Sequence, residues 1–128
     1  MRIGLDIDNV IADFDKGLLK ELKKEDKKKR NNGIINKNER YAALLFDWST
    51  KEIREFFENN MERIAKNLEL RKDVKYYMDK LIEDGHELYL ITNRVYPDYQ
   101  NPKEVTINWL KEKEINYTDE MGLMISSV

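Results

Sequence analysis

The sequence contains no cysteine and a single histidine, His86, and these two shortages exclude several kinds of site. Without cysteine there is no disulfide framework, no thiolate zinc site and no thiol nucleophile. One histidine cannot form a multi-histidine metal site, and a serine–histidine triad would have to use His86, which is expected to be a solvated turn residue. No apolar run approaches the ~18 residues of a membrane span, and acids interrupt the first one, MRIGLDID. We therefore expect a cytoplasmic protein with no membrane partner.

Neither sign of charge dominates the chain. It has 23 basic and 25 acidic residues, a formal net charge of −2, and 41% hydrophobic residues in a length of 128. These values are typical of one globular domain, or of one domain with a small insertion, and they give no global field that attracts nucleic acid. The basic run KKEDKKKR at residues 23–30 is interpreted as a solvated helix end and loop.

Strand-like and helix-like patterns alternate along the chain. Three short apolar runs predict strands: residues 3–7, ELYLIT, and LMISSV near the end. Helical spacing is found in residues 10–29, in parts of 36–67, before Gly85 and in NPKEVTINWLKEKEI. This alternation predicts an α/β fold with a Rossmann-like parallel sheet of about three strands. Residues 1–14 and 70–128 are predicted to form the core, with 15–69 as a helical cap inserted after the first strand.

Four local signals refine these elements. Asn9 stands where a tight turn needs a residue that tolerates positive φ. Ser49 or Thr50 is placed to cap a helix, Gly85 to end one, and Pro102 to occupy the first position of another.

Polar side chains follow the first two predicted strands at the point where each ends. Asp6 and Asp8 follow the first strand, and Thr92, Asn93 and Arg94 follow the second. The carboxyl ends of parallel strands meet at one edge of a sheet, where ligands of such sheets bind. The sequence therefore predicts a single site built from both clusters.

The residue types in this site favour phosphate chemistry. Two nearby carboxylates need a cation between them, and Mg²⁺ with few protein ligands often bridges to a phosphate. Asp6 is then a candidate nucleophile, and Asp8 a candidate acid and base. Thr92 and Asn93 offer polar groups to phosphate oxygens. Arg94 offers a bidentate fork, although it could also serve to cover the sheet edge.

Aromatic residues are candidates for binding the rest of a substrate. Phe14 follows the aspartates, and Phe46 and Trp48 lie in the aromatic-rich region 41–57. The alternative interpretation of that region, a small hydrophobic core, is the more frequent use of such residues.

Two segments resemble motifs of the haloacid dehalogenase superfamily. DIDNVIADF at residues 6–14 is similar to motif one, D-x-D-x-[TV], and LYLITNR at 88–94 is similar to motif two. DNVIADF, EDGHELYLITNR and NWLKE further resemble the cytosolic 5'(3')-deoxyribonucleotidase-like branch. The resemblance implies a Mg²⁺-dependent phosphatase acting on a phosphorylated small molecule, such as a (deoxy)nucleoside monophosphate.

The resemblance also implies residue roles. Asp6 would be the nucleophile and a metal ligand, and Asp8 the acid and base, with its carbonyl on the metal. Thr92 would bind the phosphoryl group, and Phe14 with the cap aromatics would stack on a base.

The chain departs from the family pattern after its third predicted strand. The motif-three lysine and the motif-four acidic pair have no counterpart in the sequence. One such group is commonly worth ~3 kcal/mol, or 10²–10³ in rate, so weak activity is expected. The first strand would also be an unpaired edge. The alternative function is a non-catalytic fragment or binding domain that a partner chain, such as a second copy, completes at this edge.

Overall fold

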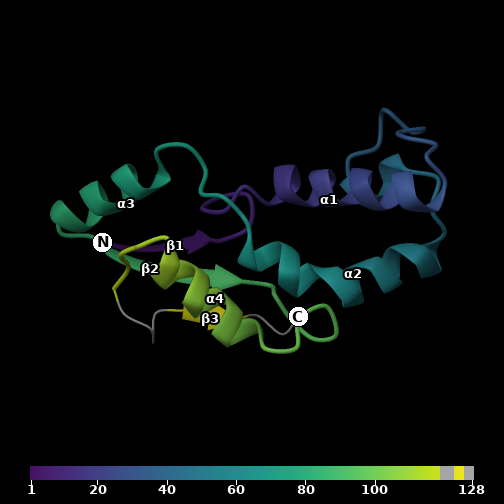
Figure 1. Ribbon diagram of the computed structural model, residues 1–128. Coiled ribbons are helices and arrows are strands. Elements are labelled where there is room, and N and C mark those ends of the chain that lie inside the picture. Colours follow the sequence, from purple (N-terminus) through teal and green to yellow (C-terminus); the bar gives the residue numbers. More distant parts are fainter. Residues whose placement is uncertain (119–122, 126–128) are drawn as a thin grey trace.

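A computed structural model describes residues 1–118 and 123–125 of the chain (Figure 1). Its elements are, in chain order, β1 (Arg2–Asp6), α1 (Phe14–Lys29), the 3-10 helix η1 (Ala42–Leu45), α2 (Thr50–Lys66), α3 (Val74–Glu83), β2 (Glu87–Thr92), α4 (Pro102–Glu112) and β3 (Leu123–Ile125). Residues 126–128, which the sequence assigns to the third strand, lie outside the described part.

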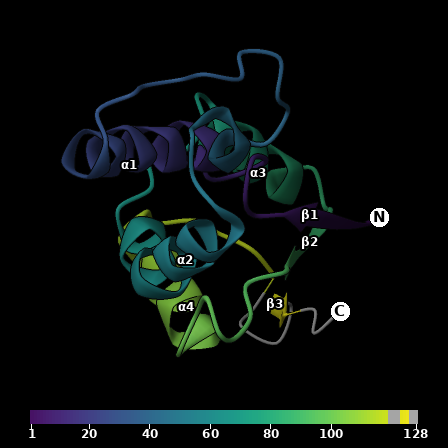
Figure 2. The same cartoon turned by 90° about the vertical axis from the view of Figure 1, so that its right-hand side faces the viewer.

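The three strands form one parallel sheet in the order β1-β2-β3, which confirms the predicted α/β class. Leu88, Leu90 and Thr92 of β2 are buried on one face. Figure 2 shows the helices gathered on that side of the strands. On the opposite face Ile91 is 39% exposed and its register partner Met124 is 52% exposed. Within the described residues, the sheet is covered on one face and β1 is an edge strand, as expected.

The region between β1 and α3 contains helices and loops and no strand of the sheet, as predicted. Its helix α2 lies against α4, and the indole N–H of Trp109 donates to the carbonyl of Leu68 (2.9 Å). At Gly17 of α1, an added Cβ would lie 2.5 Å from the Leu68 side chain, so glycine permits this close approach. Leu68 thus contacts both α1 and α4 and links them in one hydrophobic core. The division into core and cap remains a prediction.

The local sequence signals are confirmed. Asn9 (φ 68°) and Gly85 (φ 93°) both adopt positive φ. Ser49 caps α2, since its hydroxyl accepts from the N–H of Glu52 while the Glu52 carboxylate accepts from the N–H of Ser49. Pro102 opens α4. One boundary differs from prediction: α1 begins at Phe14 and not at residue 10, because the preceding residues form a tight loop.

The prediction that His86 is a solvated turn residue is wrong. Its side chain is half-buried, and its Nδ1 atom is buried without a hydrogen-bond partner in the described residues. The turn folds back on α3, since the main-chain N–H of His86 donates to the carbonyl of Leu81 (3.0 Å). Separately, no helix in the described part of the chain is both long and apolar enough to cross a membrane.

Candidate active site at the strand ends

The loop that follows β1 is a compact turn. The carbonyl of Ile7 accepts the N–H groups of Val10, Ile11 and Ala12 at 2.9–3.2 Å. Ile7, Ile11 and Ala12 are fully buried, so apolar anchors hold the turn to the core. Asp8 lies within this turn, and its direction is therefore fixed by the core rather than left to a mobile loop.

Two further groups fasten the turn from outside. The Asn9 amide donates to the Asp15 carboxylate (3.1 Å), and its oxygen accepts the Asp15 N–H (2.9 Å). The Arg71 guanidinium donates to the carbonyl of Asn9, and the Arg71 N–H donates to the carbonyl of Ile11 (2.9 Å). Sequence patterns did not indicate Arg71, which lies 62 residues from Asn9 along the chain.

Asp8 forms a bidentate ion pair with Arg94. The Arg94 Nη2 and Nε atoms donate to the two carboxylate oxygens at 2.8 and 3.1 Å. The Arg94 side chain is only 1% exposed, and its Nη1 donates to the hydroxyl of Thr106 (3.2 Å) while its guanidinium lies over the ring of Tyr99 (5.7 Å). Thr106 and Tyr99 are contacts that the sequence did not indicate.

Electrostatics hold Arg94 in its charged form. Burial alone would lower the pKa of Arg94, but the hydrogen bond and charge of Asp8 outweigh it, so the pKa lies above its ordinary value. Burial raises the pKa of Tyr99, which therefore stays a neutral phenol beside the cation. Arg94 is thus a permanent positive charge at the carboxyl edge of the sheet.

The ion pair changes two expectations. The carboxylates at this strand end were expected to need a metal between them, but Arg94 already supplies a cation to Asp8. Arg94 was also a candidate phosphate fork, and in this arrangement its fork is turned to Asp8 and buried. Arg94 lies two residues after the buried end of β2. From that position its side chain is buried and reaches Asp8.

Asp6 is the accessible carboxylate of the pair. Its residue is exposed, and its Oδ1 accepts the N–H of Ile7 (2.8 Å). Its Oδ2 has no hydrogen-bond partner in the described residues, so one oxygen is oriented and the other is open. An accessible carboxylate oxygen is available to act as a nucleophile.

Thr92 and Asn93 differ in accessibility. Thr92 is fully buried, and its hydroxyl lies 3.4 Å from the main-chain N–H of Arg94, which it accepts. Asn93 is exposed. Both lie at the predicted edge, but Asn93 is the one whose side chain reaches solvent there.

A cavity of about 620 Å³ lies beside this turn, between α1, η1 and α2. Its lining includes the predicted Phe14 together with Asn9, Tyr41, Phe57 and Asp98. Burial raises the pKa of Asp98, with a further contribution from the charge of Glu58. The volume is within the range of small-ligand pockets.

Phe46 and Trp48 do not belong to this lining, and their assignment as substrate residues is corrected. Both are buried, with ring centroids 5.9 Å apart, and Trp48 packs edge-on against Phe56 (5.5 Å). The Trp48 indole N–H is directed to Asp26 (3.1 Å). These rings form the small hydrophobic core that the sequence left as the alternative.

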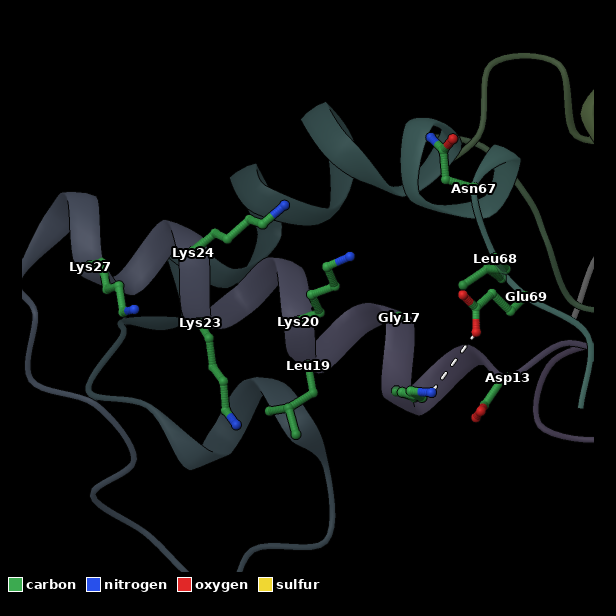
Figure 3. Close-up of a pocket in the computed structure, with 11 residues that line it drawn as sticks. Asp13, Gly17, Leu19, Lys20, Lys23, Lys24, Lys27, Asn67, Leu68 and Glu69 are labelled. Carbon is green, nitrogen blue, oxygen red and sulfur yellow. Dashed lines mark ion pairs between the residues drawn. The ribbon is translucent and has the colours of Figure 1, made fainter.

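A second cavity of about 550 Å³ lies between α1 and residues 67–69 (Figure 3). Lysines dominate its lining on α1: Lys16, Lys20, Lys23, Lys24 and Lys27. Those of the basic run are exposed, which confirms that the run is a solvated helix end. Asp26 is the exception, because it is buried.

Metal-ligand groupings of three or more acidic or histidine side chains are absent from the part of the chain that the structure describes. The open oxygen of Asp6 and the carbonyl groups of the turn remain as hard donors that suit Mg²⁺, an ion that keeps several waters. The chain matches no protein-family model, and a search of curated proteins finds no match. The resemblance to the haloacid dehalogenase superfamily therefore depends on the two motifs alone.

Proposed function

We propose that the chain is a Mg²⁺-dependent, cytoplasmic phosphomonoester hydrolase of haloacid dehalogenase type, with Asp6 as its nucleophile. The observation that carries this proposal is the contrast between the two strand-end carboxylates. Asp6 is exposed with one open oxygen, whereas Asp8 is held by Arg94 in a fixed turn. A cavity large enough for a small phosphorylated molecule adjoins the same turn.

The proposed reaction has two steps. Asp8 enters the cycle protonated, with one of its oxygens released from Arg94. The open oxygen of Asp6 attacks phosphorus, the bond from phosphorus to the leaving oxygen breaks, and that oxygen receives the proton of Asp8. Asp8 then takes a proton from a water molecule that attacks the phosphoryl group on Asp6, which releases phosphate. Both oxygens of Asp8 accept from Arg94, so at least one must leave the guanidinium during the cycle.

Asp6 and the main-chain carbonyl of Asp8 would hold the metal. When bound, Mg²⁺ would neutralise charge on the phosphoryl oxygens. Asn93 is exposed at the same edge, and we propose that its amide donates to those oxygens.

The cavity next to the turn favours a substrate with a flat, apolar part. Phe14, Tyr41 and Phe57 provide aromatic surface, and Arg40 provides a cation. We therefore propose a (deoxy)nucleoside monophosphate as the substrate class, with the base among these rings.

The test is phosphate release from an aryl phosphate with Mg²⁺, compared between the natural chain and Asp6→Asn. We expect slow release that requires Asp6 and stops with a chelator. Asn keeps the size of the side chain but removes the nucleophile. Release that is unchanged in Asp6→Asn would contradict the proposal.

A matched pair of variants tests the substrate class. Phe57→Ala should raise KM for nucleoside monophosphates and leave KM for a small aryl phosphate unchanged, while Phe56→Ala perturbs the buried aromatic core instead. Equal effects of Phe57→Ala on both substrates would remove the base-binding role.

The observed fork also favours one alternative, a domain that binds a ligand or a protein partner without turnover. Arg94 is occupied by Asp8 and the Thr92 hydroxyl is buried, so two predicted phosphate contacts are closed in this arrangement. Binding of a nucleoside monophosphate by calorimetry, without any phosphate release, would favour this alternative.

A further inference from the structure

Among the residues that the structure describes, none pairs with the outer edge of β1. In the described residues β1 pairs with β2 alone. The N–H of Glu87 donates to the carbonyl of Met1 (2.9 Å). This bond determines which residues of β1 direct their main-chain groups toward β2. Because bonding direction alternates along a strand, the main-chain groups of Arg2, Gly4 and Asp6 face away from β2. Gly4 is exposed although it has no side chain, so its main chain is open to a partner.

The sequence of β1, RIGLD, is complementary to itself in the antiparallel direction. With a two-fold axis at Gly4, Arg2 of each copy lies opposite Asp6 of the other. The same register sets Ile3 opposite Leu5 on the helix-covered face of the sheet. It also brings together the outward-facing main-chain groups, because hydrogen-bonded pairs recur at every second residue of an antiparallel ladder.

We propose that the β1 edge is an interface with a second copy of this chain. The two three-stranded sheets then become one continuous sheet, with β1 paired antiparallel to β1 of the second copy. The second copy is favoured over an unrelated strand because each charged residue of β1 meets an opposite charge at the same distance from the axis.

Edge strands often carry charges that prevent association. A strand protected in this way repels its own copy, because like charges then face each other. Arg2 and Asp6 have opposite signs and are equally spaced from Gly4, so in the antiparallel pair they attract. The charge pattern of β1 therefore distinguishes an interface from a protected edge.

The experiment is sedimentation equilibrium over a range of protein concentrations, made with a chelator because Asp6 also serves the proposed function. Arg2→Asp and Asp6→Arg each place like charges opposite each other, so each should weaken the dimer by about tenfold or more. The double variant Arg2→Asp/Asp6→Arg restores opposite charges and should recover the dimer. Glu87→Gln is the matched control, because it removes the negative charge that Arg2 contacts within one copy (3.1 Å) and leaves the self-complementary pattern intact.

A second measurement needs no variant. Amide hydrogen exchange at Gly4 and Asp6 should slow as the protein concentration rises, while exchange at exposed loop amides stays constant. A natural chain that is monomeric at every concentration would overturn the proposal. A dimer that both Arg2→Asp and Asp6→Arg retain would also overturn it. So would amide exchange at Gly4 and Asp6 that does not depend on protein concentration.

Discussion

Two arginine–carboxylate forks in this molecule have similar hydrogen-bond distances and different surroundings. At the strand ends, Arg94 grips Asp8 at 2.8 and 3.1 Å, and between α1 and α2, Arg30 grips Glu52 at 2.8 Å through both nitrogens. The two carboxylates are almost equally exposed, at 23% and 22%, but the Arg94 side chain is 1% exposed and that of Arg30 is 35%. The difference between the forks therefore lies in the arginines.

This difference determines how much stability is lost when the carboxylate of each fork is removed. Removing Glu52 leaves a guanidinium that water can solvate, whereas removing Asp8 leaves one that is buried without a counter-charge. The fork at the strand ends is thus a fixed part of the fold, and the fork between the helices is a surface contact.

The largest expected effect comes from breaking the buried fork on its acidic side. Asp8→Ala should lower the free energy of unfolding by about 3–5 kcal/mol, because Arg94 is left charged and buried. Arg94→Met should cost less, about 1–3 kcal/mol, because the remaining carboxylate is partly solvated. Urea unfolding measures both.

The double variant Asp8→Ala/Arg94→Met is the control for this asymmetry. It should recover much of the stability lost in Asp8→Ala, since no charge is left buried. Equal losses for the two single variants, with no recovery, would show that the burial of Arg94 is not the cause.

Asp26 is a buried carboxylate for which the described residues provide no ion pair, so it separates the effect of burial from that of ion pairing. Asp26 is 2% exposed and accepts the Trp48 indole N–H (3.1 Å) and the Gly33 N–H (2.7 Å). Asp26→Ala leaves both donors without this acceptor and should cost about 2–4 kcal/mol in thermal or urea unfolding. Lys28→Gln in the same basic run is the matched control, and it should change stability by less than about 0.5 kcal/mol. If the two variants had equal effects, Asp26 would be as solvated as its neighbours.

The surface fork should show itself mainly through pH. The hydrogen bond from Arg30, and then that from the Ser49 N–H, lower the pKa of Glu52 from 4.5 to about 2. The stability that Glu52 contributes is therefore complete above about pH 4.5 and is lost as the pH falls toward 2. Stability curves of the natural chain and Glu52→Gln should converge across this interval. Curves that stay parallel would contradict the lowered pKa.

The smallest expected effect is that of salt on stability, and it differs between the two forks. Raising the ionic strength from 0.1 to 1 M shortens the Debye length from ~10 to ~3 Å, so the difference between the natural chain and Glu52→Gln should shrink. The loss in Asp8→Ala should persist, because the buried guanidinium is shielded from salt. Equal salt dependence of the two would contradict the assignment of one buried and one exposed fork.

Sequence reasoning succeeded where a pattern is local. The strands, the parallel sheet, the cap at Ser49 and the turn at Asn9 all follow from neighbouring residues, and so does the placement of Asp6 and Asp8 at a strand end. Sequence patterns did not predict the ion pair of Arg94 with Asp8, because the two residues lie 86 positions apart along the chain.

The same limit explains the remaining errors. Asp26 stands in a solvated basic run, and only the position of Trp48 opposite α1 makes it a buried acceptor. Trp48 was a candidate substrate residue, but it is buried against Phe56. Sequence spacing does not reveal that packing. Phe14 lines a cavity beside the turn, and its role toward a substrate stays a prediction.

The central claim is that Asp6, the open carboxylate at the end of β1, is the nucleophile. The most direct measurement mixes the chain with an aryl phosphate and Mg²⁺, quenches the reaction with acid, and locates any phosphoryl group by peptide mass spectrometry. We predict a phosphoryl group on Asp6 in the natural chain and none in Asp6→Asn. Phosphate release without this adduct, or an adduct on another residue, would contradict the account.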